Sequence, residues 1–300
     1  MKPAMLTYNN CPICNTRYQY SVIYKKNFNL SDFNQKVFSA RRLPDKIHYQ
    51  IVKCKKCGLV RSNPVVNTSM LNQLYRVSKL NYSEEIDNLI ETYLMHLYPI
   101  LNKINKNDNI LEIGCGSGFI LHVLYKKGFK NVYGVEPSID AVSKANKLIQ
   151  KNIANEPLSS KSFPGRKFKL IFIYQTLDHI PNPNTFIKNC YNLLDRGGYI
   201  LTFNHNIDSF SSKLLKEKSP IIDIEHTYFY SPDTINKLFQ KNKFLILKVY
   251  SPINIISIKY LIWLVPLPKI IKSTILMSKL AIFNNKINIK LGNLCLIAQK

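Results

Sequence analysis

The sequence predicts an α/β fold, with a mostly parallel sheet covered by helices on both faces and a small metal-binding module in front of it. Short apolar runs alternate with helical patterns from residue 110 onward, and this alternation favours a parallel sheet. The first run ends in a glycine-rich turn, and two pairs of cysteines precede the whole alternation. We therefore expect a four-cysteine module over residues 1–68 and one larger domain over residues 69–300.

The composition is that of an ordinary globular chain with a strong positive charge. The 300 residues are 46% hydrophobic and carry a formal net charge of +24. A nucleic-acid partner would explain the charge, but Lys, Asn and Ile are abundant together, as A/T-rich codons would produce. Solvated lysines therefore explain the net charge better. Residues 1–68 nevertheless contain twelve Lys and Arg against two Asp, so a basic N-terminal face remains an alternative interpretation.

Four of the seven cysteines form two C-x-x-C pairs, Cys11 with Cys14 and Cys54 with Cys57. Two such pairs predict a closed tetrahedral site of the kind that holds structural zinc. Segments 18–24 and 47–52 read as strands that bring the pairs together. A redox dithiol is the alternative for either pair alone. The first residues lack an apolar core of signal-peptide length, so we expect a cytoplasmic protein, where cysteines are free or bind metal.

The elements of the larger domain follow from periodicity and turn signals. Residues 69–109 are helical in pattern, with Ser83 as a candidate N-cap, and are expected to cover the cofactor at the sheet edge. The expected strands are 110–113, 132–135, 170–174, 199–203, 244–249 and 294–298, with a short one near Ile153. The clearest helices are 183–194 and 231–240, and the Asp-Arg-Gly-Gly stretch at 195–198 predicts the end of the first of these and a turn into the next strand.

The glycine-rich turn carries the first chemical signal. In the segment Ile110-Leu-Glu-Ile-Gly-Cys-Gly-Ser-Gly118, a buried strand leads through three glycines into a helix. The glycines allow the backbone to approach a ligand, and the helix N-terminus offers free N–H groups. The next strand ends at Glu136, about twenty residues further on, where a carboxylate can accept both ribose hydroxyls.

These two motifs resemble the class I S-adenosylmethionine-dependent methyltransferases. Segments 171–183, 191–198 and 226–244 are similar to motifs of the ubiquinone-methyltransferase-like branch of that family. The four-cysteine module, together with the Glu-His-Thr-Tyr-Phe-Tyr-Ser segment at 225–231, resembles methyltransferases of bacterial sugar, surface-glycan and natural-product pathways. The resemblance implies a Rossmann-like seven-stranded sheet that ends in an antiparallel pair, S-adenosylmethionine as the cofactor, and a structural zinc ion.

The candidate cofactor contacts follow the carboxyl ends of the strands. Glu112 either binds the amino group of the cofactor through water or caps the glycine loop, and Gln175 either faces the methionine moiety or is a plain turn residue. Together with Glu136, the expected cofactor-binding residues are Glu112, Gly114, Cys115, Gly116, Ser117, Gly118 and Gln175.

Two histidines are candidate catalytic residues. His226 is the better general base, because imidazole accepts a proton near neutral pH and Glu225 could orient it. His179, beside Asp178, could touch the substrate, although an anchor for the following helix is the slightly favoured interpretation. For His226 a hydrogen-bonded loop residue is an equally good reading.

Residues 252–290 form an apolar insertion before the last strand. Its longest charge-free run is too short to span a membrane. Residues 270–283 are basic and amphipathic and could lie on a membrane surface, but packing on the sheet or on a second copy is the more common outcome.

The sequence therefore favours methyl transfer to a small hydroxylated acceptor, such as a sugar or a surface-glycan precursor. One alternative is an RNA methyltransferase that grips its substrate with the basic zinc module. A third hypothesis is a cofactor-binding partner protein without catalytic activity. The chain has no recognised RNA-binding module, and its aromatic residues do not alternate with the basic cluster as a stacking surface would require.

Overall fold

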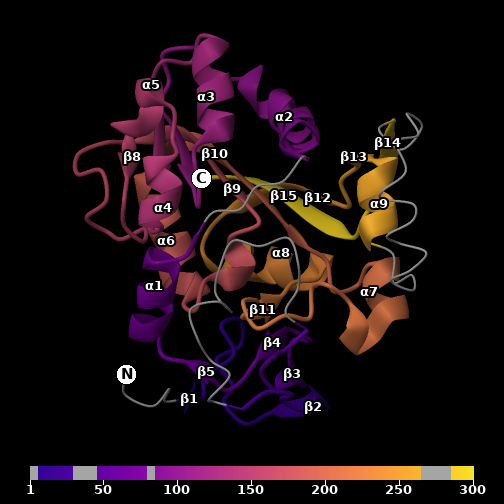
Figure 1. The fold of residues 1–300 in the computed structure, drawn as a ribbon. Coiled ribbons are helices and arrows are strands. Elements are labelled where there is room, and N and C mark those ends of the chain that lie inside the picture. Colours follow the sequence, from indigo (N-terminus) through magenta and orange to yellow (C-terminus); the bar gives the residue numbers. More distant parts are fainter. Residues whose placement is uncertain (1–5, 30–45, 80–84, 265–284) are drawn as a thin grey trace.

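A seven-stranded sheet forms the centre of the protein, as seen in a computed structural model that describes residues 6–29, 46–79, 85–264 and 285–300 (Figure 1). The strand order is β12-β15-β10-β9-β6-β7-β8. The strands are β6 (Ile110–Ile113), β7 (Val132–Val135), β8 (Ile153–Ala154), β9 (Phe168–Tyr174), β10 (Leu194–His205), β12 (Leu245–Tyr250) and β15 (Asn293–Gln299). Neighbours from β8 to β10 are parallel, whereas β15 is antiparallel to both β10 and β12. The predicted fold class is confirmed.

Helices cover both faces of this sheet because successive strand residues point to opposite sides. Ile110 packs with α2 (Ile86–Leu101), α3 (Phe119–Lys126) and α5 (Lys147–Gln150), while Leu111 packs with α6 (Pro183–Leu193) and α8 (Pro232–Lys241). Short α4 (Ile139–Ser143) follows β7. The central parallel strands β6 and β9 are buried on both faces, as strands between two layers of helices must be.

Some local predictions differ in detail from the structure. The strand expected over 47–52 begins only at Ile51. Helix α8 begins with a reciprocal capping box between Ser231 and Thr234, which fixes its start one residue after the predicted one. The predicted turn at 195–198 is wrong, because β10 already begins at Leu194 and carries this stretch as an irregularity in its pairing with β9. Gly197, at φ +70°, supplies the left-handed residue of that irregularity.

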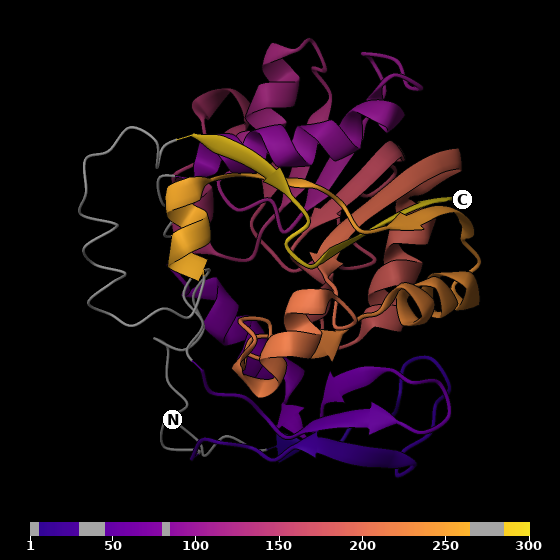
Figure 2. The same ribbon diagram turned by 90° about the vertical axis from the view of Figure 1, so that its right-hand side faces the viewer.

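The N-terminal module is a second, antiparallel sheet that the larger domain completes. Its strands are β2 (Tyr20–Tyr24), β3 (Ile51–Cys54) and β4 (Val60–Ser62), and β11 (Tyr228–Phe229) adds the fourth position beside β4. A separate pair, β1 (Leu6–Thr7) and β5 (Val65–Val66), leads into α1 (Thr68–Arg76). Figure 2 shows this sheet beneath the larger domain. The segment that carries His226 is thus tied to the module, and the boundary at residue 68 stays a prediction.

The predicted insertion at 252–290 contains a hairpin of β13 (Asn254–Ser257) and β14 (Lys286–Ile289), with α9 (Ile258–Leu264) between them. The hairpin is tied to α2 because the main-chain N–H of Ile255 donates to the Thr92 hydroxyl at 2.8 Å. The amphipathic segment 270–283 lies outside the described residues. Within the described ranges, no helix is long and apolar enough to cross a bilayer.

Candidate functional site

The glycine loop leaves β6 in a backbone conformation that only glycine adopts easily. Gly114, Gly116 and Gly118 have φ angles of +74°, +55° and +68°. A Cβ atom on Gly114 would lie 2.2 Å from the Thr176 hydroxyl oxygen, so the loop packs directly on the turn after β9. Helix α3 begins immediately after Gly118, which directs its free N–H groups toward the carboxyl edge of the sheet.

Glu136 and Glu112 bring two buried carboxyl groups to this loop. The main-chain N–H groups of Gly116 and Ser138 donate to the two carboxylate oxygens of Glu136, at 2.9 and 2.8 Å. Burial, and then the charge of Glu136, raise the pKa of Glu112 well above its usual range. The Glu112 Oε2 atom is buried and has no hydrogen-bond partner among the described residues.

This arrangement fits the cofactor that the sequence implies. A buried carboxyl group without a partner is costly, and a cationic ammonium group such as that of S-adenosylmethionine would satisfy it. Gln175 also has an unsatisfied acceptor, because its Oε1 atom is buried and has no hydrogen-bond partner within the described part of the chain. Both side chains line the same cavity as the glycine loop. The residues therefore match an amino-acid moiety beside a nucleoside.

One cavity of about 620 Å³ joins most of the predicted site residues. From the predicted set it is lined by Glu112, Gly114, Cys115, Gly116, Glu136, Gln175, His179 and His226. Ser117 and Gly118 belong to the same loop but do not line the cavity. Leu71, Tyr75 and Ser78, from α1 and the chain after it, and Tyr93 of α2 form part of its wall. That this helical span acts as a lid stays a prediction.

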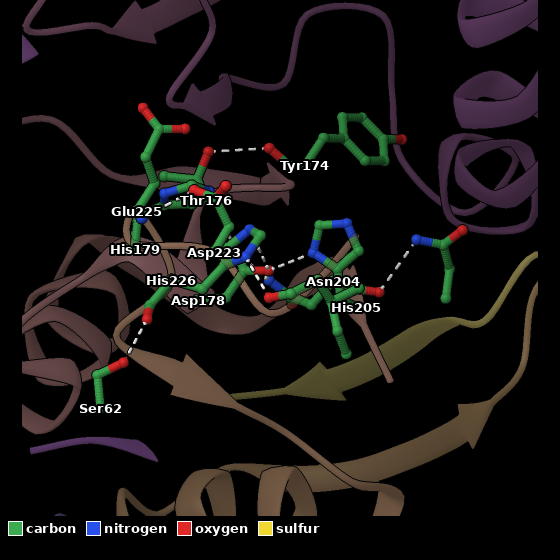
Figure 3. Close-up of polar contacts among 12 residues, drawn as sticks. Ser62, Tyr174, Thr176, Asp178, His179, Asn204, His205, Asp223, Glu225 and His226 are labelled. Atoms are coloured by element: carbon green, nitrogen blue, oxygen red, sulfur yellow. Dashed lines mark hydrogen bonds and ion pairs between the residues drawn. The ribbon is translucent and has the colours of Figure 1, made fainter. Parts of the chain in front are cut away.

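A cluster of three histidines surrounds Asp178 at one side of the cavity (Figure 3). We call Asp178, His179, His205 and His226 the Asp178 cluster. Nδ1 of His205 lies 2.8 Å from Asp178 Oδ2, and Nε2 of His226 lies 3.9 Å from that same oxygen. Nε2 of His179 is 3.8 Å from Oδ1. Asp178 is 2% exposed, so it is the buried centre of the cluster.

His226 is oriented by a main-chain carbonyl. Its Nδ1 lies 2.7 Å from the carbonyl oxygen of Ile221, whereas the sequence suggested Glu225 for this role. Burial, then His205, lower the pKa of His226. Burial also lowers the pKa of His179 to about 4, and the Tyr75 hydroxyl lies 3.1 Å from its Nδ1. Both rings are therefore neutral near pH 7.

The sequence did not indicate His205 as a site residue, nor the role of Asp178. His205 is the last residue of β10, at the carboxyl edge of the sheet, where ligands bind in this architecture. Its position two residues after the predicted strand 199–203 could have indicated His205 as a site residue. The partnership with Asp178 could not be read from the sequence, because it joins two residues 27 positions apart.

The four cysteines of the N-terminal module meet at one point. The Cys11 and Cys57 sulfurs are 3.4 Å apart, as are those of Cys14 and Cys54, while Cys14 and Cys57 are 3.8 Å apart. All four can reach a single ion. Four thiolates at such separations fit the edges of a tetrahedral zinc site and leave no open ligand position. The donor set therefore suits a zinc ion that holds structure.

Comparison with known proteins agrees with this geometry. Residues 82–249 match the family described as "Methyltransferase domain". The Ubiquinone biosynthesis O-methyltransferase of Coxiella burnetii (strain Dugway 5J108-111) is 28% identical over 112 residues, which are 35% of this chain and 47% of that protein. The protein of that name from Bradyrhizobium sp. (strain ORS 278) is 25% identical over 158 residues, 48% and 62% of the two chains. The chain thus spans about half the length of the curated relatives it matches.

Solved methyltransferase structures align with most of this chain. The magnesium protoporphyrin IX methyltransferase of Synechocystis PCC 6803 aligns over 78% of this chain and 95% of its own, with 14% identity and a TM-score of 0.47. A SAM-dependent methyltransferase from Archaeoglobus fulgidus aligns over 70% and 94%, with 19% identity and a TM-score of 0.46. The family match alone covers more than half of the chain. The chain belongs to the methyltransferase domain family, within the class I S-adenosylmethionine-dependent methyltransferases.

Proposed function

We propose that the protein transfers a methyl group from S-adenosylmethionine to a hydroxyl oxygen of a small polar acceptor, such as a sugar or a surface-glycan precursor. One observation carries the proposal: the glycine loop with Glu136 and the three histidines of the Asp178 cluster line the same cavity. Cofactor contacts and proton-accepting groups are therefore within reach of one another. The cofactor supplies an activated methyl group when bound, and the protein must position the acceptor and remove its proton.

The roles of the cofactor residues follow from their free acceptor capacity. Each oxygen of Glu136 accepts one main-chain N–H and can still accept a ribose hydroxyl. Glu112 offers a buried carboxyl oxygen to an ammonium group, and Gln175 offers an amide oxygen. The loop from Gly114 to Gly118, including Cys115 and Ser117, brings its backbone close to the ligand. These assignments are proposals for the residues that the sequence singled out.

The acceptor class is inferred from polar side chains along the cavity. Asn72, Asn182, Thr185, Asn189 and Asp223 line it with amides, a hydroxyl and a carboxylate. Such groups suit a ligand with several hydroxyls, because each hydroxyl can donate and accept a hydrogen bond. This supports the hydroxyl-rich acceptor.

The names of the relatives, ubiquinone biosynthesis O-methyltransferases, favour a second candidate, a hydroxyl of a ubiquinone precursor. Both candidates need removal of a hydroxyl proton, for which the sequence proposes His226 and His179 of the Asp178 cluster. The zinc ion that we propose for Cys11, Cys14, Cys54 and Cys57 would hold the N-terminal sheet in place and take no part in the reaction.

Calorimetry and turnover assays test the proposal in two steps. The zinc-loaded protein should bind S-adenosylmethionine and S-adenosylhomocysteine, and failure to bind either would sink the proposal. Formation of S-adenosylhomocysteine should then be measured with a nucleoside-diphosphate hexose and with 3,4-dihydroxybenzoate. Turnover with the hexose supports the polar acceptor, whereas turnover with the catechol alone would favour the quinone-type candidate. Binding with no turnover on either would favour a non-catalytic protein.

A further inference from the structure

We propose that His205 is the side chain that accepts the proton of the acceptor hydroxyl, and that Asp178 is the residue that positions it. The inference rests on the proposed methyl transfer and names the base within that site. It differs from the expectation of the sequence, which favoured His226. The three rings of the Asp178 cluster differ in the nitrogen atom that each can offer to an acceptor (Figure 3).

The hydrogen bond to Asp178 fixes which nitrogen of His205 carries the proton. Burial alone would raise the pKa of Asp178, but the hydrogen bond from His205 holds that pKa below its usual range. An ionised carboxylate can only accept, so His205 Nδ1 must donate across the 2.8 Å separation. In the neutral ring, Nε2 is then the unprotonated nitrogen. His205 lines the cavity, and Nε2 is the ring nitrogen that can accept a proton there.

The other two rings are less suited to the task. Nδ1 of His226 must donate to the Ile221 carbonyl, which leaves its Nε2 directed at Asp178 over 3.9 Å. The side chain of His226 is 11% exposed, against 30% for His205. His179 is 19% exposed, and the Tyr75 hydroxyl lies against its Nδ1. His205 is therefore the member of the cluster most open to the cavity.

The position of His205 suits the transfer. The main-chain N–H of Gln175 donates to the Phe203 carbonyl at 2.7 Å, so the end of β9 and the end of β10 lie side by side at the sheet edge. Gln175 and His205 thus flank one stretch of the cavity wall. A hydroxyl held there has the proposed cofactor site on the Gln175 side and an imidazole nitrogen on the His205 side.

The step balances with these groups alone. The acceptor oxygen forms a bond to the methyl carbon while the carbon–sulfur bond breaks, and that electron pair stays on sulfur. The hydroxyl proton goes to Nε2 of His205, and the resulting imidazolium is stabilised by ionised Asp178 through the Nδ1 hydrogen bond. Asp178 is itself held in place, because its carbonyl accepts the Thr227 N–H at 2.8 Å and Asn204 Nδ2 lies 3.4 Å from its Oδ1.

Nitrogen NMR of the full chain, labelled with ¹⁵N-histidine and saturated with S-adenosylhomocysteine, tests the tautomer without an acceptor. The ring-nitrogen signals of His205 are those that are absent from the spectrum of His205→Gln. We expect the Nδ1–H form of His205 near neutral pH, and a mixture of tautomers in Asp178→Asn. An Nε2–H form in the wild type would overturn the proposal, because that nitrogen could not accept a proton. Failure to bind S-adenosylhomocysteine would instead defeat the proposed function.

Turnover provides the second test, on the acceptor that the wild type methylates. His205→Gln keeps a donor toward Asp178 but cannot accept a proton, so turnover should fall roughly 10²–10⁴-fold with unchanged S-adenosylhomocysteine affinity. In His205→Ala, added imidazole should restore part of the rate. His226→Gln is the matched control, and a larger loss there than in His205→Gln would return the role to His226. Chelator-sensitive turnover that Mn²⁺ restores, with zinc retained, would assign the cluster to a metal ion and also overturn the proposal.

Discussion

The main-chain N–H of Gly116 donates to Glu136 Oε2 over 2.9 Å, so the loop after β6 and the acid after β7 form one unit. The Ser138 N–H holds the other carboxylate oxygen at 2.8 Å. Burial raises the pKa of Glu136 while these two N–H groups lower it. The hydrogen bonds also set the direction of the carboxylate, which faces the cavity that the glycine loop lines.

Replacing Glu136 should weaken cofactor binding. Glu136→Ala removes an acceptor for the ribose and frees the loop at Gly116, and hydrogen bonds to a charged group contribute about 1.5–3 kcal/mol. We expect the Kd for S-adenosylhomocysteine to rise roughly 10- to 100-fold in calorimetry. Glu156→Ala is the control, because Glu156 bonds Ser162 and does not line the cavity. If both variants bind S-adenosylhomocysteine with equal affinity, Glu136 does not contact the cofactor.

A methyl group on Gly114 should damage the loop for two separable reasons. Gly114 has φ +74°, and its Cβ would lie 2.2 Å from the Thr176 hydroxyl oxygen. Gly165 has φ +73° with nothing near its Cβ, so Gly165→Ala isolates the backbone cost of about 1–2 kcal/mol. Gly114→Ala should lower the urea midpoint further than Gly165→Ala and weaken cofactor binding. Similar midpoints for the two variants would mean that the loop accommodates the added methyl group.

Local patterns predicted the strands well, because each buried parallel strand is a continuous apolar run. They also located the acid at Glu136 and both cysteine pairs, since these signals depend on short spacings. Contacts between distant segments were not predictable. The pairing of β11 with β4 and the bond between His205 and Asp178 depend on how the chain folds back, and no local pattern records either. The turn at 195–198 was misread because its glycines mark an irregular strand.

Loss of zinc should affect the loop that carries His226 as well as the module. The Ser62 hydroxyl donates to the His226 carbonyl at 2.8 Å, and the Ser62 N–H donates to the Thr227 carbonyl at 2.9 Å. Elemental analysis should therefore find one equivalent of zinc in the wild type and none in Cys54→Ser, and amide hydrogen exchange at 226–229 should be faster in that variant. Cys190→Ala, which removes a buried thiol outside the cluster, should keep its zinc. Unchanged exchange in the zinc-free variant would separate the module from this loop.

Stability should fall as the pH drops below about 6.5, the usual pKa of histidine. Burial lowers the pKa of His179 to about 4 and also lowers that of His226. Between the unfolded and the folded pKa of each histidine, the unfolded chain binds a proton that the folded protein does not. The free energy of unfolding therefore falls by up to about 1.4 kcal/mol per histidine for each unit by which the pH decreases. Urea unfolding at pH 7 and pH 5 should therefore give a lower free energy of unfolding at pH 5.

Comparing the wild type with His179→Asn, each at pH 7 and at pH 5, shows whether His179 causes this loss of stability. Asparagine does not titrate, so the variant should lose less stability than the wild type between pH 7 and pH 5, whatever its absolute stability. Release of zinc from protonated thiols also destabilises the protein at low pH, but it affects both proteins equally and cancels in the difference. Equal losses in the two proteins would show that the His179 pKa is not lowered in the folded state, and that its ring is solvated enough to take up a proton like a free histidine.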